Sequence, residues 1–195
     1  MSEILFIRHA ETDMAGTFCG HSNPPLNMRG RTQLSELLRI LSVEPIDEVY
    51  ASDLLRAQET AEAIAEDRAI ECHLRPALRE INFGQWEGFT WREIEQSHSA
   101  YAHRWVAEYP DLPAPDGESI SEFERRVLAE VKLLTMKVKN SGTVVVTHGG
   151  VLRTVLCRLR GHSEEEAWKA TRNYCSIVRY EIPTSPSARS IEVRS

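Results

Sequence analysis

The chain has 195 residues, close to the size of one domain, and we expect residues 1–195 to form a single domain with a sizeable core. Its composition is 42% hydrophobic and 27% charged, which is ordinary for a folded protein and argues against wholesale disorder or a fibrous structure. The formal net charge of -6 offers no basic surface to a nucleic acid, so none is expected as a partner. An anionic ligand would have to be held by a local cluster of positive charge.

The sequence shows no membrane or secretion signal. Its apolar runs fall short of the roughly 18 residues needed to span a bilayer, and Arg8 interrupts the amino terminus before a signal-peptide core could form. We therefore expect a cytoplasmic protein. The cysteines, Cys19, Cys72, Cys157 and Cys175, are widely spaced and form no C-x-x-C pair, so neither a zinc site nor a disulfide framework is indicated.

Strand and helix patterns alternate along the first half of the chain. They predict a strand at 4–7, a helix at 34–41, a strand at 46–51, a helix at 52–64 and a short strand at 70–74. Arg8 and His9 directly follow the first strand, and Arg56 falls in the first turn of the second helix. A loop at 79–88 comes next, and helical residues resume near Trp91.

The second half begins with a loop at 109–117 that contains three prolines. Two Ser-x-x-Glu capping boxes predict helix starts, one from Ser119 to Glu122 and one from Ser163 to Glu166. The remaining patterns predict a buried β-branched strand at 143–147, an apolar helix at 151–159 and late strands at 176–182 and 190–193. His148 follows the strand at 143–147 in the sequence His-Gly-Gly.

This alternation predicts an α/β fold, a three-layer sandwich with a mainly parallel sheet and helices on both faces. In open parallel sheets ligands bind outside the carboxyl ends of the strands. Arg8, His9, Arg56 and His148 all fall at such ends. A single histidine or arginine at a strand end is more often structural than functional, but four from separate units that converge on one place favour a site.

These residue types suit phosphoryl transfer. A neutral imidazole can attack phosphorus directly, so we expect His9 to be the nucleophile. Arg8 and Arg56 can make bidentate contacts with phosphate oxygens, and His148, which we expect to be protonated, can donate a further hydrogen bond. Glu80 lies in a partly apolar loop, where a carboxyl can keep its proton near neutral pH and act as a general acid.

The residues described above resemble the histidine phosphatase superfamily, whose fold is also called phosphoglycerate-mutase-like. The resemblance rests on four segments in the family's order: Arg8-His9-Ala10-Glu11, Ser52 to Ala61 around Arg56, Glu80, and Thr147-His148-Gly149-Gly150. It spans nearly the whole chain and implies a phosphohistidine mechanism with no metal and no other cofactor. Two positions depart from the family pattern: Ala10 replaces a glycine, and Ala15 replaces an asparagine that often follows the nucleophile.

The resemblance also bears on the substrate. The loop at 18–21 is similar to a segment that touches the phosphate or its leaving group in relatives, which implies that Cys19 and Gly20, together with Gly149, are substrate-binding residues. The segment at 82–88 looks like the phosphatase branch of the family, including alpha-ribazole phosphatases. We therefore expect a phosphatase that acts on a small phosphorylated metabolite. The loop at 13–23 and the insertion at 91–117 would select its organic half.

Other functions stay open at this point. A phosphoglycerate-mutase-type phosphotransferase would use the same residues but retain the phosphohistidine for a second ligand. A catalytically silent binding module could keep the fold, although all five core residues are present. A metal-dependent hydrolase with His9 and His148 as ligands lacks the usual spacing of metal-binding side chains. The sequence does not settle the oligomeric state, for which a homodimer is one alternative.

Overall fold

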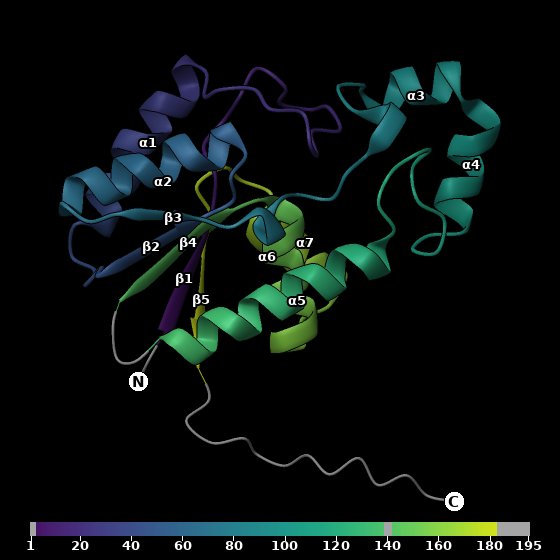
Figure 1. Cartoon of the computed structure of the whole chain (residues 1–195). Coiled ribbons are helices and arrows are strands. Elements are labelled where there is room, and N and C mark those ends of the chain that lie inside the picture. Colours follow the sequence, from purple (N-terminus) through teal and green to yellow (C-terminus); the bar gives the residue numbers. More distant parts are fainter. Residues whose placement is uncertain (1–2, 139–141, 183–195) are drawn as a thin grey trace, which may run out of the picture.

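A five-stranded sheet forms the centre of the structure, a computed structural model that describes residues 3–138 and 142–182 (Figure 1). Its strands, in the spatial order β3-β2-β4-β1-β5, are β3 (Cys72–Leu74), β2 (Glu48–Ala51), β4 (Thr143–Thr147), β1 (Glu3–Arg8) and β5 (Ile177–Glu181). The first four of these run parallel, and β5 pairs antiparallel with β1. The predicted mainly parallel sheet is therefore confirmed.

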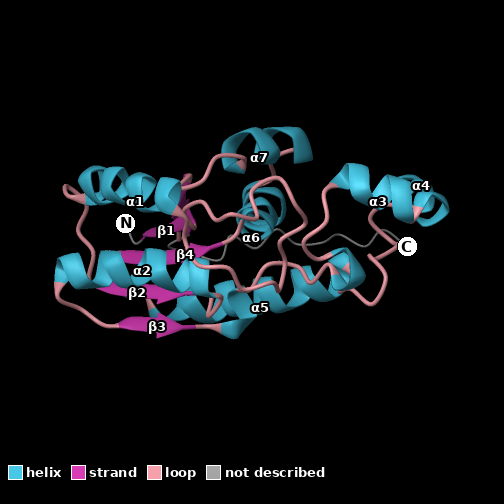
Figure 2. Ribbon diagram, turned by 90° about the horizontal axis from the view of Figure 1, so that it is seen from above, coloured by secondary structure: helices cyan, strands magenta, loops and turns pink. Residues whose placement is uncertain are grey.

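Helices cover both faces of this sheet. In chain order they are α1 (Met28–Leu41), α2 (Leu55–Arg68), α3 (Trp91–Ser97), α4 (Ser99–Ala107), α5 (Ile120–Lys137), α6 (Gly149–Thr154), which continues as a π-helical turn at Val155–Leu159, and α7 (Glu164–Thr171). Short 3-10 turns lie at Pro76–Leu78 and Gly84–Trp86. Figure 2, seen from above, shows α3 and α4 set apart from the sheet, at the end of the molecule away from α1.

The alternation of side chains along β1 produces the layers. Leu5 and Ile7 face the helices α1 and α2, in a cluster that includes Leu37 and Leu41. Ile4 and Phe6 point to the opposite face, where the apolar stripe of α5 and the helix α6 cover them, because successive residues of a strand face opposite sides. Two separate cores thus sandwich the sheet, which confirms the three-layer arrangement.

Several element boundaries differ from those predicted. Helix α1 begins at Met28, well before the predicted start at 34, because Asn27 caps it by accepting the N–H of Gly30. The segment 28–33 has little apolar periodicity, so pattern alone misses it. The helix predicted at 151–159 begins at Gly149. Both capping boxes are present, and the strand predicted at 190–193 lies outside the described residues.

An aromatic cluster joins the segment α3–α4 to the rest of the structure. Trp86 is fully buried at its centre, and the rings of Phe18, Trp91, Tyr101 and Trp105 surround it with centroids within 6.3 Å. Edge-to-face contacts of this kind add to the free energy gained by burying the rings. The cluster fixes the position of α3 and α4 beside the loop that carries Phe18, and this loop leads into the site described next.

Candidate active site

The carboxyl ends of the parallel strands bring together the four residues predicted to converge. His9 follows β1, and its backbone N–H donates to the carbonyl of Thr147, the last residue of β4, at 2.9 Å. The rings of His9 and His148 are 5.1 Å apart between centroids. Arg56, in the first turn of α2, reaches His9 from the other side. The strand-end positions in the sequence thus correspond to one location in space.

His9 is held in a single tautomer. Its Nδ1 lies 2.7 Å from the carbonyl oxygen of Ala10 and must carry a hydrogen to donate to it, so Nε2 keeps its lone pair. The Nε of Arg56 donates to that Nε2 at 3.2 Å. Burial and the neighbouring guanidinium groups of Arg56 and Arg8 hold the pKa of His9 well below its ordinary value. The ring is therefore neutral, and the electron pair on Nε2 accepts the hydrogen bond from Arg56.

Arg56 is fully buried and is fixed by the loop that precedes α1. One terminal nitrogen donates to the carbonyl oxygen of Ser22 at 2.7 Å, and the other donates to those of Gly20 at 2.8 Å and Cys19 at 3.2 Å. Burial lowers the pKa of this guanidinium, which nevertheless stays charged near neutral pH. The loop thus orients a cation toward His9.

Arg8, the residue before His9, is held by the segment at the end of α7 and just after it. Its guanidinium stacks on the ring of Tyr174, with Cζ 4.3 Å from the ring centroid, and its Nη1 donates to the carbonyl oxygens of Thr171 at 3.1 Å and Arg172 at 2.6 Å. Its Nε is buried and has no hydrogen-bond partner within the described residues. Sequence patterns gave no signal for Tyr174, because its place beside Arg8 depends on the path of the chain after α7.

The expectation that His148 is protonated is wrong for the ligand-free protein. The residue is fully buried, and burial together with Arg56, His9 and Arg8 holds its pKa well below the ordinary value. Its Nε2 lies 2.8 Å from the hydroxyl of Ser52, which itself accepts the N–H of Leu54. The hydroxyl hydrogen is free to donate to Nε2, and in that arrangement the ring hydrogen is on Nδ1. A neutral His148 can therefore still donate from Nδ1, which is buried without a partner.

Glu80 is a buried carboxyl held between two backbone amides. One oxygen accepts the N–H of Ile81 at 3.0 Å, and the other accepts the N–H of Gly150, in the first turn of α6, at 2.9 Å. A side chain at position 150 would collide with this carboxyl, because its Cβ would lie 2.1 Å from the Oε1 of Glu80. The second glycine of the His-Gly-Gly sequence thus makes room for the carboxyl.

Arg126 of α5 holds the backbone of the Glu80 loop from behind. Its terminal nitrogens donate to the carbonyl oxygens of Ala77 at 3.0 Å, Arg79 at 2.7 Å and Glu80 at 2.8 Å. It also forms a bidentate pair with Glu118 at 2.7 Å. Sequence reasoning did not single out this residue, because its contacts join segments about 50 positions apart.

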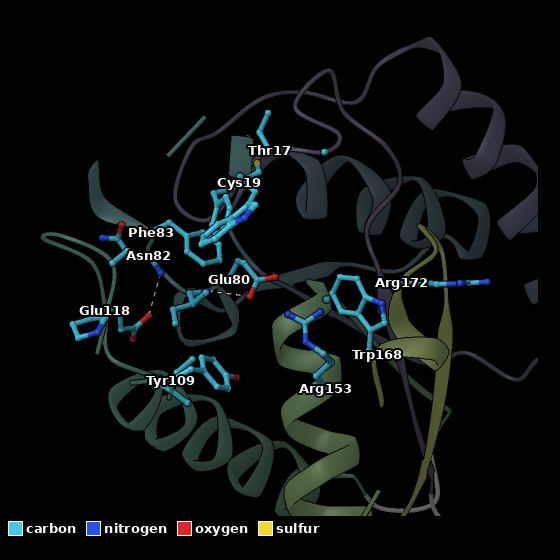
Figure 3. Close-up of a pocket in the computed structure, with 18 of the residues that line it drawn as sticks. Thr17, Cys19, Glu80, Asn82, Phe83, Tyr109, Glu118, Arg153, Trp168 and Arg172 are labelled. Atoms are coloured by element: carbon cyan, nitrogen blue, oxygen red, sulfur yellow. Dashed lines mark hydrogen bonds between the residues drawn. The ribbon is translucent and has the colours of Figure 1, made fainter. Parts of the chain in front are cut away.

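A pocket of about 860 Å³ lies next to this group of side chains (Figure 3). Arg56 and His148 are fully buried and are not among its lining residues. Arg8, His9 and Glu80 line it, and Cys19 and Gly149, both predicted to touch the substrate, also line it. Gly20 does not. Its N–H donates to the carboxylate of Glu87 at 3.0 Å, so this amide is occupied and we no longer assign Gly20 to the substrate.

Glu87 organises this part of the site and was not identified from the sequence. Its carboxylate accepts the backbone N–H groups of Gly20, His21, Ser22 and Phe83 and the hydroxyl of Ser22, at 2.7 to 3.0 Å. Burial raises the pKa of Glu87, but the hydrogen bonds from Ser22, His21 and Phe83 outweigh it and leave the pKa below its ordinary value. An ionised Glu87 therefore ties the loop that holds Arg56 to the loop that carries Glu80.

Two buried nitrogen atoms of the site, Arg8 Nε and His148 Nδ1, are available to bind a ligand. Buried N–H groups in folded proteins are almost always hydrogen-bonded, yet Arg8 Nε and His148 Nδ1 have no partner in the described structure. A tetrahedral oxyanion beside His9 would supply acceptors to such donors. Among residues 3–138 and 142–182, no three His, Cys, Asp or Glu side chains are grouped so that they could hold a metal ion.

Comparison with known proteins decides the family. The model of the histidine phosphatase superfamily (branch 1) matches residues 4–188. The chain belongs to this superfamily. It is 32% identical over 167 residues to the adenosylcobalamin/alpha-ribazole phosphatase of Escherichia coli, which covers 85% of this chain and 82% of that protein. It is 31% identical to phosphoserine phosphatase 1 of Hydrogenobacter thermophilus over 98% of this chain and 90% of that protein.

Solved structures agree with this family assignment. The alpha-ribazole phosphatase from Shigella flexneri superimposes with a TM-score of 0.83 at 29% identity, covering 93% of this chain and 91% of that one. These findings confirm the expected phosphoglycerate-mutase-like fold and the expected class of activity, so this histidine phosphatase is a phosphoric monoester hydrolase.

Proposed function

We propose that this histidine phosphatase hydrolyses a small phosphorylated metabolite through a phosphohistidine formed on Nε2 of His9. The state of His9 carries the proposal. The ring is neutral, its hydrogen is committed to the Ala10 carbonyl, and its lone pair faces the Nε of Arg56, where an anion would be attracted. A nucleophile in this form needs no base to remove a proton before it attacks.

The reaction then takes two balanced steps. In the first, Nε2 attacks phosphorus, the P–N bond forms as the ester P–O bond breaks, and a protonated Glu80 gives its proton to the departing oxygen. In the second, water attacks the phosphohistidine while Glu80 accepts a proton from it, and the P–N bond breaks with its electron pair returning to Nε2. Phosphate and a neutral His9 result. One carboxyl thus acts first as acid and then as base.

The surrounding donors would hold the phosphoryl group. Arg8 Nε and His148 Nδ1 are the unpartnered nitrogens, and Arg56 can turn its Nε from His9 to a phosphate oxygen once the phosphorus atom approaches. Donors fixed before the substrate arrives stabilise developing charge without reorganisation, which is why such sites accelerate reactions. Gly149, in the pocket wall at the start of α6, would add a backbone N–H, and Cys19 would lie beside the substrate.

The outer pocket would receive the organic half of the substrate. Its walls carry the aromatic rings of Phe83, Trp91, Trp105 and Tyr109, two of them from the segment α3–α4. A volume of about 860 Å³ leaves space well beyond a phosphate group and falls in the range of small-molecule sites. The names of the relatives suggest two kinds of substrate to assay: phosphate esters with a nucleoside-like half and phosphate esters of an amino acid.

The competing functions predict different behaviour. A mutase would return its phosphoryl group to a second phosphorylated ligand rather than to water. A silent binding module would have no use for a buried neutral histidine beside two unpartnered donors. A metal-dependent hydrolase would lose its activity in excess chelator, whereas we expect activity to survive because arginines and histidine supply the positive charge.

The experiment is to replace His9 with alanine and assay a panel of phosphate monoesters in the presence of chelator. We expect the His9→Ala variant to keep its circular dichroism spectrum and unfolding transition but to lose turnover by at least about 10⁴-fold, as is typical when a covalent nucleophile is removed. His162→Ala is the matched control, because His162 is exposed and lies outside the pocket. Retention of activity by His9→Ala contradicts the proposal.

A further inference from the structure

Arg153 is a cationic side chain in the pocket wall for which the mechanism above has no use. It lies on α6, four residues after Gly149, so both residues are on the same side of that helix. Figure 3 shows its guanidinium pointing into the pocket between Glu80 and Trp168. Within the part of the chain that the structure describes, no carboxylate or carbonyl oxygen forms an ion pair or hydrogen bond with it.

Stacking holds this guanidinium in place without neutralising it. Its Cζ lies 5.1 Å from the centre of the Trp168 ring, which α7 contributes to the same wall. An arginine stacked on an indole keeps all of its N–H donors available at the edges of the plane. The guanidinium of Arg153 is therefore held in a fixed position in which its N–H groups can bind an anion.

The distance to the phosphate-binding residues limits where that anion can be. A Cβ placed on Gly149 would lie 3.5 Å from Nη1 of Arg153 and 3.7 Å from both Cζ and Nε of Arg8. The two guanidinium groups thus flank one point in the pocket wall. Burial is the main reason that the pKa of Arg8 is lowered; Tyr174 and Glu80 act against this effect, and Arg153 is close enough to add to it.

The position of Glu80 shows which part of the substrate Arg153 would meet. Glu80 is hydrogen-bonded to the N–H of Gly150, the residue next to Gly149, so it lies on the same stretch of wall as Arg153. As the proton donor, Glu80 has to stand beside the leaving oxygen. A group on this side therefore addresses the organic half near the ester bond rather than the transferred phosphoryl oxygens.

Acidic side chains close the region beyond Arg153. Glu164 and Glu165, from the first turn of α7, also line the pocket. Glu165 is paired with Lys169 at 2.6 Å, on the exposed side of α7. Because the carboxylates of Glu164 and Glu165 repel a further anion at that end of the wall, a second negative charge on the substrate is favoured on the phosphate side of them, next to Arg153.

We propose that Arg153 is a specificity-determining residue that binds a carboxylate two or three bonds from the ester oxygen of the substrate. The preferred substrates are then phosphate monoesters of short hydroxy acids or hydroxy amino acids. The carboxylate accepts a bidentate hydrogen bond from Arg153 while Arg8, Arg56 and His148 hold the phosphate. This inference rests on the proposed function, because it uses Glu80 as the marker of the leaving-group side.

The test compares two esters that differ only in the carboxylate, O-phosphoserine and O-phosphoethanolamine. The quantity of interest is the ratio of their kcat/KM values, measured for wild type, Arg153→Met and the matched control Arg160→Met. Arg160 is exposed at the end of the same helical stretch and is not part of the pocket lining. We expect wild type and Arg160→Met to prefer phosphoserine, and Arg153→Met to lower the ratio by about 10- to 100-fold, the range for a lost charged hydrogen bond.

Other outcomes overturn the inference and are distinguishable from one another. Equal losses on both esters would mean that Arg153 holds the transferred phosphoryl group. An unchanged ratio in Arg153→Met, or a wild type that does not prefer the carboxylated ester, would mean that no carboxylate binds there. p-Nitrophenyl phosphate distinguishes a failure of this inference from a failure of the proposed function. A wild type that hydrolyses none of the three esters contradicts the proposed phosphatase function itself.

Discussion

A single hydrogen bond determines the chemistry available to His9. The carbonyl oxygen of Ala10 takes the hydrogen of Nδ1, so the lone pair is on Nε2, on the side of Arg56. Ala10 itself is fully buried and donates its N–H to the hydroxyl of Thr60 at 3.1 Å. The methyl group of Ala10, at the position where the family pattern has glycine, is therefore part of the buried core next to the nucleophile.

At the same scale, Glu80 is open to a test that depends on the leaving group. Acid catalysis is typically worth about 10² to 10⁴-fold, so Glu80→Gln should lose turnover on that scale with alkyl phosphates. p-Nitrophenolate departs without much help from a proton, so its ester should lose far less. The glutamine NH₂ group also replaces an acceptor of the N–H of Ile81 or of Gly150, which disturbs the local structure. This effect is the same for both substrates, so it cancels in the ratio of their rates.

The measurement is the rate of the first phosphoryl transfer, followed by rapid quench with an alkyl and an aryl ester. Glu164→Gln, which removes a carboxylate from the α7 side of the pocket wall, serves as the control for a change of charge near the substrate. If Glu80→Gln slows both esters by the same factor, another group protonates the leaving oxygen, and Glu80 has a structural role between the two amides.

At the scale of elements, α5 and the acid loop depend on each other through Arg126. Its guanidinium holds three carbonyl oxygens of the segment that carries Glu80. We expect Arg126→Met to release that segment and to lower kcat about 10- to 100-fold for alkyl phosphates, with a much smaller effect on the aryl ester, because misplacing a catalytic group by about 1 Å can cost about 10²-fold.

The matched control is Arg125→Met, which changes an exposed arginine of the same helix. Arg126→Lys should fall between wild type and methionine, since an ammonium group cannot reproduce the fork that reaches several acceptors. A loss that is equal for alkyl and aryl esters, or one that tracks only a loss of folded protein, would show that Arg126 stabilises the fold without positioning Glu80.

The elements also show what the sequence can and cannot predict. The strands before His9 and His148 were predictable because each is an unbroken apolar run that ends in a polar residue. The start of α1 was not, because it depends on the Asn27 cap and on Gly30, where a Cβ would lie 2.2 Å from the carbonyl oxygen of Glu11. That contact joins distant parts of the chain and has no local pattern.

The same distinction holds for the site. Arg8, His9, Arg56 and His148 were predictable as a group because topology alone places strand ends together. The neutral state of His148, the occupied amide of Gly20 and the contacts of Glu87 were not, since each depends on burial or on a partner far along the chain. Sequence patterns locate the chemistry, and long-range packing sets its protonation and its rigidity.

For the whole molecule, the two buried histidines couple stability to pH. In the unfolded chain a histidine gains a proton as pH falls through about 6.5, but burial keeps His9 and His148 neutral in the folded state. The unfolded state then binds more protons, so the free energy of unfolding decreases as the pH is lowered through about 6.5. When the pH is lowered from 7.5 to 5.5, each of the two histidines should reduce the free energy of unfolding by up to about 1.4 kcal/mol.

Urea unfolding at several pH values measures this effect. Replacing one of the two histidines, as in His9→Gln, should reduce the loss between pH 7.5 and 5.5 by that histidine's share, whereas His162→Gln changes an exposed ring and should leave the slope nearly unchanged. A His9→Gln variant with the full wild-type slope would show that His9 gains its proton in the folded protein and is not held neutral.

The surroundings of the site in the whole molecule also suit a small ligand. The segment α3–α4 lies to one side of the sheet and contributes aromatic rings to the pocket, while the parallel strands contribute the phosphate-binding side (Figures 1 and 2). None of the helices in residues 3–138 and 142–182 is long and apolar enough to cross a membrane. The cytoplasmic location stays a prediction for cell fractionation, and light scattering distinguishes a monomer from a homodimer, which is one alternative for the oligomeric state.

Trapping the phosphoenzyme tests the central claim most directly. Wild type is mixed with a ³²P-labelled monoester, quenched in alkali within one turnover, and mapped by peptide sequencing, because phosphohistidine survives base and is lost in acid. The account predicts base-stable, acid-labile label on His9, formed at least as fast as steady-state turnover and absent from His9→Ala. Turnover in wild type without label on His9, or label that forms more slowly than product appears, would contradict it.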